Sequence, residues 1–217
     1  MSLVEELQRE ALDPNVRVGD LLRKALVVAT KLKLEEFRQW CALELDGYRR
    51  VDVPEYRKTK GEVYVNSSHF GSNPMVFREP EMAELVTLHK ERAPVGPLNE
   101  LLAKGGSDVL IMAFPPAILN LLLLELPDFA GVPQLHLNKG YVRMIIETVR
   151  NTILNWSLKL EKEGILGQGM SFSPEEKKIA AQDAKELQPP ISITIHHMQD
   201  SVIQSDSSGS TIEIKRG

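Results

Sequence analysis

The sequence predicts an α+β fold, with a mainly α-helical body, a small β-sheet and a C-terminal tail patterned like a β-hairpin. Apolar residues recur at helical spacing through most of the chain up to Leu187. After Pro189-Pro190 they alternate with polar residues, which is strand spacing. The 217 residues, 42% of them hydrophobic, suffice for an ordinary globular core. We therefore divide the chain into a body (1–187), a proline linker (188–190) and a β-forming tail (191–217).

The first strong helical patterns lie near the N-terminus and predict a helical hairpin. Between Val18 and Leu32 apolar residues recur every three to four positions, with charged residues between them. A second helix begins near Leu34 and carries Phe37, Cys41 and Leu45 on one stripe. It should end at Gly47, because glycine is favoured just past a helix end.

A loop and a small sheet are expected next. Pro54 prevents the residues from Tyr48 to Arg57 from continuing the helix. Residues 61–65 alternate as a strand does, and residues 132–137 offer a partner strand.

Further helices are expected in the second half of the body. Pro80 and Pro97 mark two helix starts, and the uniformly apolar run 118–126 predicts a central helix buried on nearly every side. A continuous apolar stripe predicts a long helix over 141–163. Ser173, followed by proline and glutamates, caps a last helix that should reach about Leu187.

The tail is too short to build its own core, and a lone two-stranded hairpin is marginally stable in water. It therefore needs a partner, which could be the body's own sheet edge, the tail of another copy or another protein. We expect self-association through its alternating apolar residues, which are Ile191, Ile193, Ile195, Val202, Ile203, Ile212 and Ile214.

Charge and cysteine content exclude several classes of protein. Thirty acidic against twenty-six basic residues give a net charge of −4, which argues against a broad nucleic-acid-binding surface, although a local basic cluster stays compatible with it. The single cysteine and the absence of a leader pattern indicate the reducing cytoplasm. The longest apolar region, 109–126, is interrupted by prolines, Asn120 and Glu125, so we expect no membrane span.

The best candidate for a ligand site is the loop that contains Tyr48, Arg49, Tyr56 and Arg57, with Arg150 on the long helix as a further contributor. Arginine and tyrosine together suit contacts to phosphates and stacked bases. The alternative is structural: the tyrosines pack the loop onto the body while the arginines pair with nearby acidic residues, which are Glu44, Asp46 and Glu55. Arg150 would then face solvent.

Other chemistry-bearing residues favour structural interpretations. Cys41 shares an apolar stripe and has no histidine close to it in sequence. The five histidines lack metal-ligand spacing, so we expect no metal and no cofactor. Gly164, Gly167 and Gly169 resemble a phosphate-binding loop, but they follow a helix rather than a strand. No catalytic constellation emerges, and a non-enzymatic function is favoured.

Two blocks of sequence resemble the AbiTii domain family. They are residues 40–48 with 53–57, and residues 149–161 with 164–173; together they bracket a similarity over residues 3–183. The resemblance implies a bacterial protein of abortive infection, or phage defence, and brings no catalytic residues with it.

Three functional hypotheses follow. The leading one is an interaction and assembly module of an antiviral defence system. The second is a toxin-like effector that acts on RNA or nucleotides through the loop arginines. The third is a domain that senses a nucleotide without reacting with it.

Overall fold

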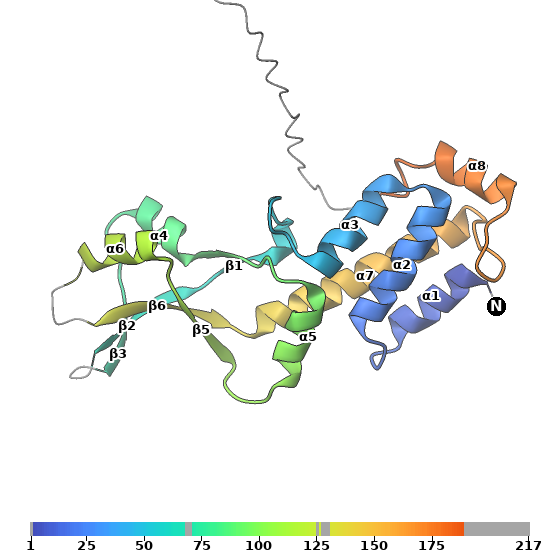
Figure 1. Ribbon diagram of the computed structural model, residues 1–217. Coiled ribbons are helices and arrows are strands. Elements are labelled where there is room, and N and C mark those ends of the chain that lie inside the picture. The colour runs from blue at the N-terminus through green and yellow to red at the C-terminus, as the bar shows by residue number, and fades with distance from the viewer. Residues whose placement is uncertain (1, 68–70, 125, 127–130, 189–217) are drawn as a thin grey trace, which may run out of the picture.

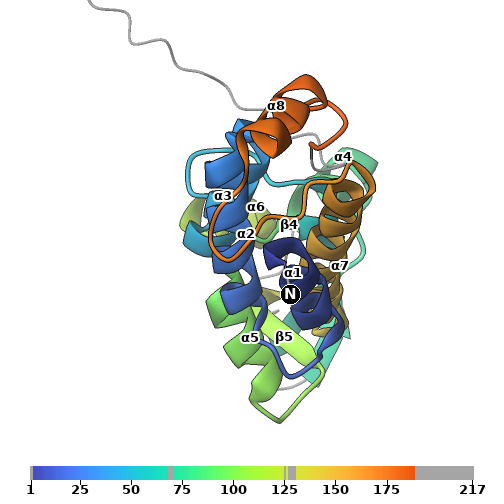
Figure 2. The same ribbon diagram turned by 90° about the vertical axis from the view of Figure 1, so that its right-hand side faces the viewer.

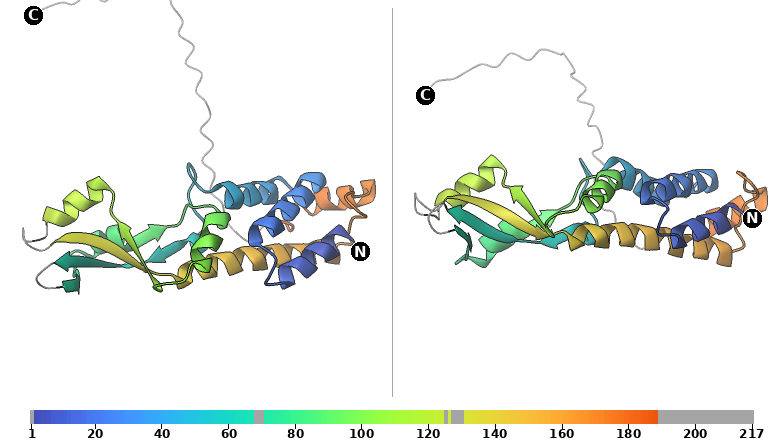
Figure 3. Two further views of the ribbon diagram at one scale, coloured as in Figure 1. Left: turned by 60° about the horizontal axis from the view of Figure 1, so that its bottom comes forward. Right: turned by 90° about the horizontal axis from the view of Figure 1, so that it is seen from below.

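The computed structural model describes residues 2–67, 71–124, 126 and 131–188. It confirms the α+β class with a helical body. The molecule is elongated: a helical end and a sheet end are joined by one long helix, α7 (Gly140–Lys162) (Figures 1 and 3). The seven tail residues expected to drive assembly lie outside the described residues. Within those residues, no helix is long and apolar enough to cross a membrane.

The helical end is built around α7. The predicted hairpin is present as α2 (Val18–Leu32) and α3 (Glu35–Asp46), which pack against each other. Helix α1 (Leu3–Leu12) packs along α7, and α8 (Pro174–Gln182) lies against α2 (Figure 2). The ring of Phe37 stacks on that of Trp156 with 3.8 Å between centroids. This contact ties the hairpin to α7 in the centre of the core.

The sheet end contains an antiparallel four-stranded sheet in the order β3-β2-β6-β5. Its strands are β2 (Glu62–Ser67), β3 (Gly71–Pro74), β5 (Val109–Ala113) and β6 (Val132–Asn138). The predicted pairing of 61–65 with 132–137 is confirmed, with Val63 opposite Leu135. Helices α4 (Pro80–Thr87) and α6 (Pro116–Leu124) lie over one side of the sheet (Figure 1).

The junction between the two ends is made of short elements. A 3-10 turn, η1 (Glu55–Arg57), leads into β1 (Lys58–Lys60), which pairs with β4 (Leu88–Lys90). Helix α5 (Val95–Ala103) follows and packs on α7. It begins two residues before the predicted start at Pro97.

The prediction of a central buried helix at 118–126 is wrong. The helix there, α6, buries Leu122 completely but leaves Leu124 82% exposed and Leu121 and Leu123 each 43% exposed. Uniform apolarity indicates that a helix prefers burial, yet the sheet end covers α6 on one side only. Helix α8 also ends earlier than predicted, because residues 183–187 form hydrogen-bonded turns.

Candidate functional site

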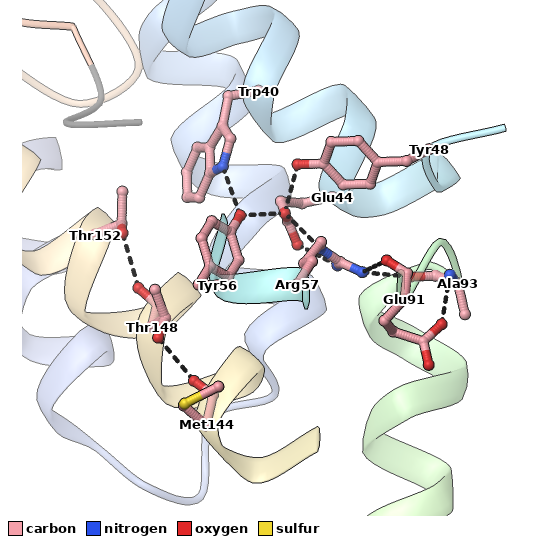
Figure 4. A network of polar contacts seen from close by, with 10 residues as sticks. All are labelled: Trp40, Glu44, Tyr48, Tyr56, Arg57, Glu91, Ala93, Met144, Thr148 and Thr152. Carbon is pink, nitrogen blue, oxygen red and sulfur yellow. Dashed lines mark hydrogen bonds and ion pairs between the residues drawn. The ribbon is translucent and has the colours of Figure 1, made fainter. Parts of the chain in front are cut away.

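Three of the loop residues singled out in the sequence, Tyr48, Tyr56 and Arg57, meet the last turns of α3 at the junction of the two ends (Figure 4). Trp40 and Glu44 are four residues apart and therefore share one face of α3. Gly47 ends the helix with a φ of 88°, and a side chain there would collide with the backbone oxygen of Arg92. This turn directs Tyr48 inward, where it is fully buried.

Glu44 is the centre of a buried polar network (Figure 4). Its Oε1 accepts hydrogen bonds from the hydroxyls of Tyr48 (2.6 Å) and Tyr56 (2.5 Å) and from Nε of Arg57 (3.0 Å). Its Oε2 accepts from Nη2 of Arg57 at 2.5 Å. The side chains of Glu44 and Arg57 are both 0% exposed. We call these residues, with Trp40, the Glu44 network.

The remaining donors of the network are also used. Nη1 of Arg57 donates to the carbonyl oxygens of Glu91 (3.2 Å) and Ala93 (2.9 Å). Nε1 of Trp40 donates to the hydroxyl of Tyr56 at 3.0 Å. The guanidinium also lies 4.9 Å from the ring centroid of Tyr48, within cation–π range. Arg57 is therefore engaged by α3 on one side and by the segment after β4 on the other.

Burial and charge suppress acid–base chemistry in this network. Burial, reinforced by the charge of Glu44, raises the pKa of Tyr48 and of Tyr56 far above its ordinary value. Burial acts to lower the pKa of Arg57, but Glu44 outweighs it and the net shift is upward. Arg57 thus stays charged and both tyrosines stay protonated. The arrangement suits holding two segments together rather than proton transfer.

A second polar cluster lies beside the first. The carboxylate of Glu91 accepts from the hydroxyl of Tyr141 (2.8 Å) and the backbone N–H of Ala93 (2.8 Å), and it lies 3.4 Å from Nε2 of His89. Burial raises the pKa of Glu91, but these hydrogen bonds prevail and lower it to about 2. Sequence reasoning missed this cluster, because Tyr141 is fifty residues away from Glu91.

The other two candidate residues do not join the Glu44 network. Arg49 is exposed at the surface. Nη1 of Arg150 donates to backbone oxygens of Asp13 (2.9 Å) and, at longer range, of Glu10 and Ala11, while Nη2 donates to that of Val16 (2.6 Å). The two sequence interpretations had placed Arg150 either beside the loop or in solvent, and both are wrong. Arg150 binds carbonyl groups in the last turn of α1 and in the turn that follows this helix.

The glycine-rich turn after α7 holds an internal anion. Oε1 of Glu176 accepts from the backbone N–H groups of Leu166 (2.9 Å) and Gly167 (2.7 Å), and its Oε2 accepts from that of Ser173 (2.7 Å). These are the kind of groups that a phosphate would use. The same carboxylate completes the capping box of α8 with Ser173.

The remaining candidates also occupy structural positions. Cys41 is buried, as expected, and burial raises the pKa of its thiol well above the ordinary value. His196 and His197 lie outside the described residues. Among the residues that are described, no group of three or more histidine, cysteine or carboxylate side chains could hold a metal ion.

In contrast to these sealed polar groups, the sheet end exposes apolar side chains. Strand β5 and helix α6 present six of them, which are Val109, Ile111, Met112, Leu121, Leu123 and Leu124. A groove of about 990 Å³ lies between β3, the segment after it and α4, and its apolar lining includes Met75, Phe77 and Leu85. Exposed apolar surface of this kind is common at interfaces between proteins.

Comparison with known proteins gives one match. The AbiTii family model matches residues 2–185. No curated protein and no solved structure matches the chain.

Proposed function

We propose that this chain, which belongs to the AbiTii family, is an interaction and assembly module of a bacterial antiviral defence system. The family's name points to abortive infection. The observation that carries the proposal is the exposed apolar surface of β5 and α6, because exposed apolar patches are common where proteins bind one another. In this proposal the tail at 191–217 drives self-association.

The polar residues support an interaction role more than the effector or sensor alternatives. Both alternatives use Tyr48, Tyr56 and Arg57 for an outside ligand. In the structure these side chains bind Glu44, and Arg57 also binds two backbone carbonyls. A ligand would have to displace a buried charge pair, and separating such a pair is strongly unfavourable.

The test is the molar mass in solution of the full-length chain and of a chain that stops after Gln188, measured by light scattering. We expect the full-length chain to form oligomers and the shortened chain to have a lower mass. Equal masses for the two chains would refute assembly through the tail. Circular dichroism of both chains serves as the control that the body is folded.

A further inference from the structure

Strand β5 is an unprotected sheet edge. It pairs with β6 on one side, and no strand among the described residues pairs with its other side. Its sequence, Val-Leu-Ile-Met-Ala, contains neither a charge nor a proline, the devices that normally protect edge strands. Val109 and Ile111 are 43% and 58% exposed. The opposite edge, β3, is Gly-Ser-Asn-Pro and ends in a proline.

The chain itself contains a segment with the matching pattern. In Ile191–Ile195 three isoleucines alternate with a serine and a threonine. This segment is five residues long, as is β5. A short alternating segment becomes stable by joining an existing sheet, where its backbone groups pair with those of the edge strand.

The segment begins far from the β5 of its own chain. The carbonyl of Leu187 accepts a hydrogen bond from Nε1 of Trp156 at 3.0 Å, which anchors the body's end on α7. Trp156 lies sixteen residues after Gly140, or about 24 Å along the helix. Strand β5 begins beyond Gly140, with Val109 opposite Asn138, and leads further away (Figures 1 and 3).

The available chain length decides the question. If α7 and β5 followed one line, the helix rise and two strand residues would place Ile111, the centre of β5, roughly 30 Å from Leu187. Ile193 is the sixth residue after Leu187, and six fully extended residue steps span at most about 21 Å. Pairing of the segment along the whole of β5 therefore favours a second copy as the donor.

We propose that Ile191–Ile195 of one copy adds to β5 of a neighbouring copy as a fifth strand of its sheet. This inference rests on the proposed function and names the surface that receives the tail. Each copy would carry one donor strand and one acceptor edge. Such head-to-tail contacts produce rings or open filaments, not only dimers.

Cross-linking between two full-length variants tests the pairing. One variant carries Ile111→Cys and the other Ile193→Cys; the native Cys41 is buried and does not compete for the reagent. With a short bismaleimide, we expect cross-linked dimers when the two variants are mixed and little product from either alone. An Ile193→Cys chain mixed with Leu12→Cys, which is exposed at the helical end, is the control.

Each alternative gives a different result. Product from Ile111→Cys alone would mean that two β5 edges meet, and product from Ile193→Cys alone that two tails meet. A chain with both cysteines that cross-links only internally would place the tail on its own sheet. Any of these results, or no product from the mixture, overturns the proposal.

A lysine substitution on β5 tests this inference separately from the proposed function. We expect full-length Ile111→Lys to fall to the mass of the chain ending at Gln188, because lysine on an edge strand opposes pairing. Val76→Lys, at a position 87% exposed outside β5, should keep the full-length mass. If Ile111→Lys keeps it too, β5 is not the acceptor, although tail-driven assembly stands. If full-length and shortened chains have equal mass, the proposed function itself fails.

Discussion

The buried pair of Glu44 and Arg57 is the strongest polar feature at the scale of single residues. The pair positions three segments relative to one another, because it joins α3, η1 and the segment after β4 at one point. A buried ion pair adds little net stability over apolar residues of the same shape, whereas removal of one partner leaves a buried charge unpaired. The pair therefore fixes how the two ends of the molecule meet.

Arg57→Met should lower the free energy of unfolding by about 3–5 kcal/mol, because Glu44 would lose its buried counter-ion. Arg38→Met removes a pair with Glu35 that is largely exposed, and should cost much less, because water screens exposed ion pairs. Urea denaturation of both variants measures the difference. Equal effects would contradict a structural role for the buried pair.

Glu91 predicts a dependence of stability on acid pH. Its pKa is about 2 in the folded chain against an ordinary value of 4.5. The folded state therefore gains stability from the charged carboxylate above pH 4.5 and loses it as the pH falls from about 4.5 to 2. Melting temperatures of the wild type and Glu91→Gln across this range should converge toward the acid end. Parallel curves would show that Glu91 does not titrate in this way.

At this scale the sequence predicted one of the two polar clusters, and only as an alternative. It offered pairing of the loop arginines with nearby acids, Glu44 among them, as the alternative to a ligand site, because these residues are close in sequence. It could not find the cluster of His89, Glu91 and Tyr141, since α5, β5, α6 and β6 lie between β4 and α7 in the sequence.

At the scale of elements, α1 shows how a short helix depends on its neighbours. Leu3, Leu7 and Ala11 have helical spacing and Ser2 forms a capping box with Glu5, so the signal was present in the sequence and was overlooked. The C-terminal end of α1 depends instead on Arg150 of α7. That contact joins residues 140 positions apart, so no local sequence pattern predicts it.

Arg150→Ala should destabilise the chain by about 2 kcal/mol, the usual magnitude for hydrogen bonds to a charged group. Hydrogen exchange should rise first in α1, because its last carbonyls lose their donors. Arg143→Ala, which removes an exposed arginine from the same helix, is the matched control. Exchange that is unchanged in residues 3–12 would refute this role.

Two glycines in the turn after α7 give a matched test of packing. Both have positive φ, 74° at Gly164 and 72° at Gly167. A Cβ at Gly164 would meet nothing within 4 Å, whereas one at Gly167 would lie 2.8 Å from the ring of Phe172. We expect Gly164→Ala to cost about 1–2 kcal/mol and Gly167→Ala to cost at least 1 kcal/mol more. Thermal unfolding of the two variants measures this difference, and equal midpoints would contradict it.

The contrast between α6 and α7 explains which elements the sequence could place. A single apolar stripe on α7 predicted which side of the helix faces the core. Its residues Val142, Ile153 and Leu160 are buried in the structure. Helix α6 has Asn120 as its only polar residue, so its sequence does not show a continuous polar side opposite an apolar one. The structure covers only the side that bears Leu122.

At the scale of the whole molecule, the two ends differ in how completely they bury their apolar side chains. The helical end closes its core with five helices and the stacked rings of Phe37 and Trp156. The sheet end leaves β5 and one side of α6 open. We read this difference as a division between a stable support and a contact surface.

Substitutions on α6 should separate these two properties. Leu124→Gln, at a position 82% exposed, should leave the unfolding free energy within about 0.5 kcal/mol of the wild type and reduce binding of an apolar dye. Leu122→Ala, in the buried position two residues before, should cost about 2–5 kcal/mol. Chemical denaturation and dye fluorescence measure the two effects. An equal loss of stability in both variants would mean that Leu124 is covered.

The continuity of α7 sets a length scale for any assembly. Its 23 residues form one uninterrupted helix of about 35 Å, with the body's end anchored near one terminus and β5 beside the other. In head-to-tail contact, about 24 Å of this helix, from Gly140 to Trp156, would lie between the acceptor edge of a copy and the point where its donor tail begins. The helix would then hold the donor tail and the acceptor edge of each copy apart by a fixed distance.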